Sequence, residues 1–125
     1  MSEPSANRTV LIVDDDIGIR ELLTRSLSFE GFNVLEAANG LDALAQLRKG
    51  RRPSVIVLDL RMPVMDGWAF RIAQRADPRI SQIPVVILSG ADTHRFQEIE
   101  PVAALEKPVS LSRLADCLHR VLEHP

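Results

Sequence analysis

The sequence predicts an α/β fold in which a doubly wound, five-stranded parallel sheet carries helices on both faces. Three short runs are apolar on every residue or nearly so, which is typical of strands buried on both faces. They alternate along the chain with segments whose apolar residues recur at helical spacing. Such alternation favours parallel strands joined by helical crossovers. The 125 residues are enough for one domain with its own core.

The five strands are expected at residues 9–13 (TVLIV), 33–37 (NVLEA), 54–58 (SVIVL), 85–88 (VVIL) and 102–105 (VAAL). The first, third and fourth of these runs are apolar and rich in β-branched residues, so we place them inside the sheet. The second run carries a glutamate and the fifth is mostly alanine. We interpret these two weaker runs as the edges of the sheet.

The ends of the predicted helices are marked by residue types that commonly start or end a helix. Gly31 and Gly50 end the first two, because glycine accepts the left-handed conformation of a helix C-terminus. A third helix begins near Asp66, its cap, and Gly67, and it ends before Pro78, since the residue before proline disfavours helix. The apolar stripes are Ile19, Leu22, Leu23 and Leu27 in the first helix, Leu41, Leu44 and Ala45 in the second, and Leu111, Leu114, Ala115, Leu118 and Leu122 in the last, which Ser110 caps.

Two segments are predicted to be weakly ordered. Between residues 90 and 101 only Phe96 and Ile99 form an apolar pair, so a fourth helix there is expected to be short. Residues 1–7 (MSEPSAN) are polar and are expected to form a disordered tail, which leaves residues 8–123 as the folded domain.

Composition limits the compartment and the partners. Cys117 is the single cysteine, which excludes an internal disulfide and suits a reducing compartment. No run approaches the roughly 18 apolar residues of a membrane span, so we expect a cytoplasmic protein without membrane contact. The 15 basic and 17 acidic side chains nearly balance, and the basic run RKGRR (48–52) is interpreted as favouring a helix C-terminus. Direct nucleic-acid binding is therefore not expected.

Three acidic residues follow two of the buried strands. Asp14 and Asp15 come directly after residue 13, and Asp59 follows residue 58, whereas Asp16 is interpreted as extending the acidic loop. Ligand sites in such sheets lie at the carboxyl ends of the strands. Two carboxylates about 5 Å apart repel by roughly 3 kcal/mol at an effective dielectric of about 20, so a cation is expected to neutralise the cluster. Oxygen ligands without histidine or cysteine select a hard ion, and Mg²⁺ fits such a site.

Four motifs in order along the chain resemble the receiver domain of two-component response regulators. They are LIVDDD (11–16), VLDLRMPVMDG (57–67), ILSG (87–90) and EKP (106–108), and the resemblance covers residues 8–123. It implies a flavodoxin-like fold with strand order 2-1-3-4-5 and, in this chain, a shortened fourth helix. It also implies a signalling domain rather than an enzyme, apart from catalysis of its own phosphorylation and dephosphorylation.

The resemblance assigns a role to each matching residue. Asp59 is the acceptor of a phosphoryl group from a sensor histidine kinase or a histidine phosphotransfer protein, and the switched domain then controls a downstream effector protein. Asp14, Asp15, Asp59 and the backbone carbonyl of Arg61 are the implied Mg²⁺ ligands. Ser89 and Lys107 are implied to contact the phosphoryl group, the Lys107–Pro108 bond to be cis, and Asp66 and Gly67 to be structural.

Two positions are expected to modify signalling. Ala104 stands three residues before Lys107, where the family often has an aromatic residue that moves inward on phosphorylation. The side chain of Arg61 lies two residues beyond the acceptor and is expected to change the lifetime of the acyl phosphate. The spacing from Ser89 to Lys107 is also about one helical turn shorter than expected of the family, which again indicates a short fourth helix.

Two other functions remain as alternatives. A haloacid-dehalogenase-like phosphatase also forms an aspartyl phosphate after a strand, but such an enzyme needs an acid two residues later, where this chain has Arg61. The second alternative is a receiver-like interaction module that is never phosphorylated in the cell. The complete set of acids, Ser89 and Lys107 argues against it.

Overall fold

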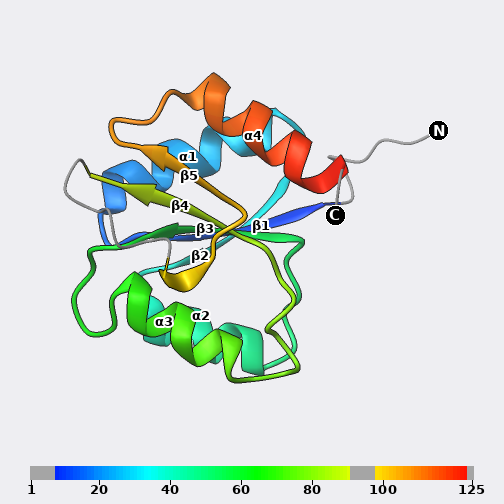
Figure 1. Ribbon diagram of the computed structural model, residues 1–125. Coiled ribbons are helices and arrows are strands. Elements are labelled where there is room, and N and C mark those ends of the chain that lie inside the picture. The colour runs from blue at the N-terminus through cyan, green and yellow to red at the C-terminus, as the bar shows by residue number, and fades with distance from the viewer. Residues whose placement is uncertain (1–7, 91–97, 124–125) are drawn as a thin grey trace.

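The computed structural model describes residues 8–90 and 98–123, which form a parallel sheet covered by helices on both faces (Figure 1). The strand order is β2-β1-β3-β4-β5, with α1 and α4 on one face and α2 and α3 on the other. The elements are β1 (Thr9–Val13), α1 (Ile17–Phe29), β2 (Asn33–Ala37), α2 (Gly40–Arg48), β3 (Val55–Asp59), α3 (Gly67–Arg75), β4 (Val85–Ser89), β5 (Ala103–Glu106) and α4 (Leu111–Glu123). The predicted fold class and strand order are confirmed.

The sheet separates two apolar layers, because successive side chains of a strand point to opposite faces. Leu11 and Val13 of β1 pack toward α2 and α3, whereas Val10 and Ile12 pack toward α1 and α4. Every residue of β3 and β4 is buried, as predicted for the interior of the sheet. Edge strands β2 and β5 are only partly buried, which confirms their predicted place.

Several boundaries and faces differ from the sequence-based prediction. Strand β3 begins and ends one residue later than expected, β4 extends to Ser89, and β5 spans residues 103–106 rather than 102–105. In α2 the buried face is formed by Ala43, Leu44 and Leu47, while Leu41 is 53% exposed. The predicted α2 stripe was right at Leu44 and wrong at Leu41 and Ala45, which are exposed, because its short apolar pattern fits two faces of one helix.

The segment that joins β4 to β5 is described only in part. Residues 91–97, on which most of the expected short helix falls, and the expected tail at residues 1–7 both lie outside the described residues. Glu98 and Ile99 form a short 3₁₀ turn, and Ile99 is buried in the layer under α2 and α3. None of the described helices is long and apolar enough to cross a membrane.

The basic run near residue 50 lies at the end of α2, as predicted. Arg48 occupies the last turn, and the Arg52 guanidinium donates a hydrogen bond of 2.6 Å to the carbonyl of Leu47. Cations and N–H donors at this end of a helix satisfy its free carbonyls and complement its dipole.

Candidate functional site

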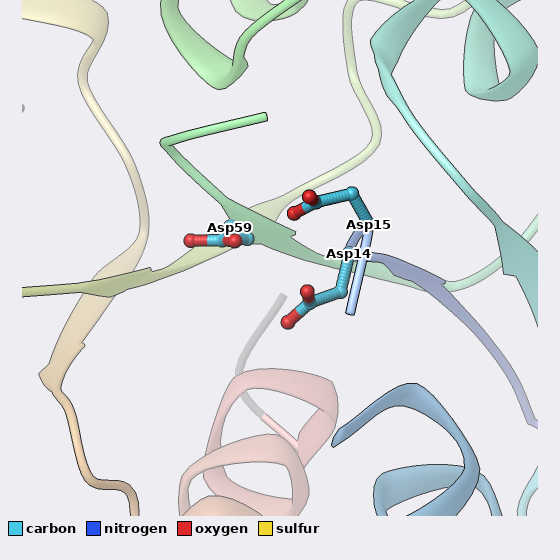
Figure 2. A group of neighbouring side chains, drawn as sticks. All are labelled: Asp14, Asp15 and Asp59. Atoms are coloured by element: carbon cyan, nitrogen blue, oxygen red, sulfur yellow. The ribbon is translucent and has the colours of Figure 1, made fainter. Parts of the chain in front are cut away.

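Three carboxylates meet where β1 and β3 end side by side. Val13 pairs with Leu58 in the ladder between these strands, so Asp14 and Asp15 leave β1 next to Asp59, the last residue of β3. Each of the three residues offers a carboxylate oxygen, and these oxygens all lie within 4.8 Å of one another (Figure 2). The predicted convergence of the three acids is confirmed.

Asp14 is the most buried of the three. Its side chain is 1% exposed, and one carboxylate oxygen, Oδ1, accepts a 2.9 Å hydrogen bond from the backbone N–H of Asp16. The other oxygen, Oδ2, is buried and has no hydrogen-bond partner among the residues that the structure describes. Burial raises the pKa of Asp14 above its ordinary value and the negative charge of Asp59 adds to this, although the Asp16 N–H opposes both. A buried anion in this state favours the binding of a cation.

Lys107 brings a positive charge to the cluster from the turn after β5. Its ammonium group lies 2.9 Å from Oδ1 of Asp59, which is itself 6% exposed. The backbone N–H of Lys107 donates a 2.7 Å hydrogen bond to the carbonyl of Ser89, and the peptide bond to Pro108 is cis. Lys107 and Asp59 are 48 residues apart in the sequence, so the fold alone creates this ion pair.

Ser89 reaches the sheet edge that carries this cluster, and Arg61 follows Asp59 by two residues. Ser89 is the buried last residue of β4 and follows Leu88, the residue that pairs with Asp59, so it reaches the same edge of the sheet. Arg61 is exposed and lines a cavity of about 380 Å³ together with Pro63, Asp66 and Trp68. The roles expected of Ser89 and Arg61 stay predictions.

The loop after Asp59 is fixed by contacts at its far end. Asp66 caps α3, where its Oδ1 accepts a 2.9 Å hydrogen bond from the N–H of Ala69, as predicted. The N–H of Gly67 donates to the carbonyl of Leu60 at 2.9 Å. A Cβ atom at position 67 would lie 2.8 Å from the backbone oxygen of Asp59, so only glycine permits this approach.

Sequence reasoning missed two residues that support the acidic cluster. Asp16 does more than extend the loop, because its Oδ1 accepts a 3.0 Å hydrogen bond from Ile19 and thereby caps α1. Arg20, one turn further along α1, donates a 2.7 Å hydrogen bond to the carbonyl of Asp14 and also pairs with Glu36 of β2. The position of Arg20 one helical turn after the acidic loop was the signal that could have indicated this contact.

Residues 10–119 match the family described as the response regulator receiver domain. The chain belongs to this family. A receiver domain is a signalling module rather than a conventional enzyme, so the phosphatase alternative is rejected.

Individual relatives support the same assignment. The chain is 35% identical over 120 residues to sporulation initiation phosphotransferase F of Bacillus subtilis, and the alignment covers 93% of this chain and 94% of the relative. It is 38% identical over 109 residues to response regulator MprA of a Mycobacterium species, covering 84% of this chain but only 46% of that longer protein. The solved structure of chemotaxis response regulator CheY4 of Vibrio cholerae superimposes with a TM-score of 0.82 at 33% identity, covering 92% of this chain and 98% of that one.

Proposed function

We propose that this receiver domain, spanning residues 8–123, accepts a phosphoryl group on Asp59 in a two-component or phosphorelay pathway. The observation that carries the proposal is the pairing of Asp59 with Lys107 inside a cluster of three carboxylates at the sheet edge. The donor is a phosphohistidine on a sensor histidine kinase or a histidine phosphotransfer protein, which agrees with the family and with the name of the Bacillus relative.

Mg²⁺ is the ion that this donor set fits best. Asp14, Asp15 and Asp59 would hold it, with the backbone carbonyl of Arg61 as a further ligand. Oxygen donors alone favour a hard ion, and the unpartnered Oδ2 of Asp14 provides a buried ligand atom. The bound ion would neutralise charge on the transferring phosphoryl oxygens.

The residues of the chain position and stabilise the transfer. A carboxylate oxygen of Asp59 attacks phosphorus, and the new O–P bond forms as the N–P bond of the phosphohistidine breaks, leaving its electron pair on the imidazole. Lys107 holds the carboxylate at 2.9 Å before transfer and pairs with the phosphoryl group after it. The Ser89 hydroxyl donates a hydrogen bond to a phosphoryl oxygen. Positioning and charge neutralisation of this kind supply most of the catalysis in phosphoryl transfer.

A change of charge at the site provides the signal. With a divalent ion bound, the charges of the three aspartates and Lys107 sum to zero. Phosphorylation replaces one carboxylate charge by roughly two, so the site moves to about −1 and attracts nearby donors. A downstream effector protein reads the rearranged surface. Because Ala104 has no rotamer to switch, the readout does not depend on an aromatic side chain at that position.

Intact mass after incubation with acetyl phosphate and Mg²⁺ tests the proposal. The wild type is expected to gain one phosphoryl group and Asp59→Asn to gain none, because the nucleophilic carboxylate is lost. Asp66→Asn is a matched control, since asparagine also caps a helix and its side chain lies on the same loop. A wild type that stays unlabelled would support the alternative of an interaction module that is not phosphorylated. Labelling of Asp59→Asn would show that another residue accepts the phosphoryl group.

A further inference from the structure

Two buried polar side chains on α3 lie away from the acidic cluster and have no part in the chemistry proposed above. Arg71 is 8% exposed and Gln74 is completely buried, although both lie on the helix face that packs against the sheet. Polar side chains at such positions are costly unless their hydrogen bonds are satisfied. Their partners therefore show what they are needed for.

The hydrogen bonds of this pair connect α3 to two separate turns. Arg71 donates through Nε to the carbonyl of Ile99 at 2.8 Å and through Nη2 to the carbonyl of Glu100 at 2.9 Å. Its Nη1 donates to Oε1 of Gln74 at 2.8 Å. The amide nitrogen of Gln74 donates in turn to the carbonyls of Ile80 and Ile83, at 2.9 and 3.0 Å. We call Arg71 and Gln74 the α3 clamp.

The clamp holds backbone rather than an opposite charge. The acceptors of Arg71 in these hydrogen bonds are two consecutive main-chain carbonyls and one amide, and Glu100 adopts a left-handed conformation with φ of 50°. This conformation is unfavourable for a residue other than glycine. Apolar side chains of similar volume often replace buried polar groups with no loss of stability. We therefore interpret the clamp as determining the conformation of the turn at residues 99–100.

The register of strand β5, which begins three residues after Glu100, depends on contacts outside the strand. Within residues 8–90 and 98–123, β5 is an edge strand bonded only to β4, its sequence is AALE, and none of its residues is buried. Small, partly exposed side chains fix the register of a strand weakly. The two ends of β5 are held more firmly, by the α3 clamp before it and by the bonds of Lys107 to Ser89 and Asp59 after it.

We propose that Arg71, supported by Gln74, is a positioning residue that sets the register of β5 and so holds Lys107 within reach of Asp59. A planar guanidinium that binds two consecutive carbonyls distinguishes one register from the next. A slip of one residue would move Lys107 by about 3.3 Å and turn the strand over, which would break the 2.9 Å contact with Asp59. The role of Lys107 at the phosphoryl group rests on the function proposed above.

The test is the affinity for beryllofluoride, a mimic of the phosphoryl group on Asp59, titrated calorimetrically at saturating Mg²⁺. Arg71→Met is expected to weaken binding at least tenfold. Arg75→Met is the matched control, because Arg75 lies on the same helix and pairs with the carboxylate of Glu100 but is exposed; it is expected to change affinity less than twofold. Failure of the wild type to bind beryllofluoride would contradict the proposed function. If Arg71→Met bound beryllofluoride as tightly as Arg75→Met and the wild type, only this inference would be overturned.

A double-mutant cycle separates positioning from general support of the fold. In a Lys107→Met background, Arg71→Met is expected to weaken beryllofluoride binding less than twofold further, because its effect acts through Lys107. A full tenfold loss in that background would overturn the inference.

If Arg71→Met does not fold, Arg71→Lys is the variant that tests the inference. Lysine keeps the charge but cannot bind two carbonyls as a planar fork. We expect this variant to bind beryllofluoride at least threefold more weakly and to exchange the amide hydrogens of Val102 and Lys107, which bond to β4, faster than the wild type. Unchanged affinity and exchange would also overturn the inference.

Discussion

At the scale of single residues, the burial of Asp14 costs folding stability and favours the binding of a cation. The Asp14 carboxylate is buried, one of its oxygens has no hydrogen-bond partner among the described residues, and two other carboxylates lie within 4.8 Å. An unsatisfied buried polar group costs about 1–3 kcal/mol. The placement of Asp14, Asp15 and Asp59 directly after two buried strands identified the cluster. The sequence could not show which of the three is most buried, because this depends on where β1 ends against β2 and β3.

Asp14→Asn is expected to raise the free energy of unfolding in the absence of divalent ions by about 1 kcal/mol or more, since the amide removes a buried charge and donates to a neighbouring carboxylate. The same change is expected to abolish stabilisation by Mg²⁺. Urea unfolding with and without 10 mM MgCl₂ measures both effects.

Asp15→Asn provides the comparison, because Asp15 is exposed. It is expected to reduce stabilisation by Mg²⁺ without the same gain in its absence. If Asp14→Asn were instead less stable than the wild type under metal-free conditions, burial of the charge would not be the main cost at this position.

At the scale of elements, the loop between β3 and α3 is determined by close backbone approach. Gly67 lies against the backbone of Asp59 and Leu60, and Gly40, at the start of α2, donates a 3.0 Å hydrogen bond to the carbonyl of Met65. Asp59, the proposed acceptor, thus has Gly67 packed against its backbone at a point where no side chain fits.

Gly67→Ala is expected to destabilise the fold by about 1–3 kcal/mol, because the new Cβ would lie 2.8 Å from backbone atoms that cannot yield easily. It is also expected to slow labelling by acetyl phosphate, since one of those atoms belongs to Asp59. Thermal unfolding and intact mass over time are the measurements.

Gly18→Ala is the control, because its Cβ would meet only the Asp16 side chain at an ordinary distance of 3.4 Å. In an exposed helical position this change is expected to stabilise by a few tenths of a kcal/mol to about 1 kcal/mol. Equal stability of the two alanine variants would show that the loop behind Asp59 adapts to a side chain.

How well each element could be predicted depends on how far apart in the sequence the interacting residues lie. Strands β1, β3 and β4 and the cap at Asp66 depend on neighbouring residues, and the sequence predicted them to within one residue. The clamp residues Arg71 and Gln74 received no role, because the carbonyl acceptors of Arg71 are 28 and 29 residues away. The edge strand β5 was predicted as closely as β3, because each was displaced by one residue.

At the scale of the whole molecule, the order of the strands places the site. Parallel strands joined by helices put all carboxyl ends at one edge, so the meeting of Asp14, Asp15 and Asp59 could be predicted. The ion pair of Lys107 with Asp59 could not be predicted from pattern alone, and only the resemblance to receiver domains indicated that Lys107 belongs to the site.

Ion pairs of Asp77, which lies outside the acidic cluster, make the free energy of unfolding depend on pH. Hydrogen bonds from Arg79 hold the pKa of Asp77 at about 2, below its ordinary value of 3.8, and Arg48 of α2 adds to this. Since the folded pKa is the lower one, the stabilisation by Asp77 is present above about pH 4 and is lost as the pH falls through 2.

Asp77→Asn is therefore expected to be less stable than the wild type at pH 5, with the difference shrinking at pH 2.5. Urea midpoints at the two pH values measure it. A difference that stays constant with pH would show that the hydrogen bonds of Asp77 do not depend on its charge.

The chain has one tryptophan, Trp68, and no tyrosine. Trp68 lines the cavity beside Arg61, and its buried indole nitrogen has no hydrogen-bond partner in the part of the chain that the structure describes. Excitation at 295 nm therefore selects one fluorophore, next to Gly67 and nine residues beyond Asp59. An indole without a hydrogen-bond acceptor emits at a wavelength that depends on the polar groups that approach it. The tryptophan emission of the protein therefore reports on the loop that follows Asp59, the proposed acceptor.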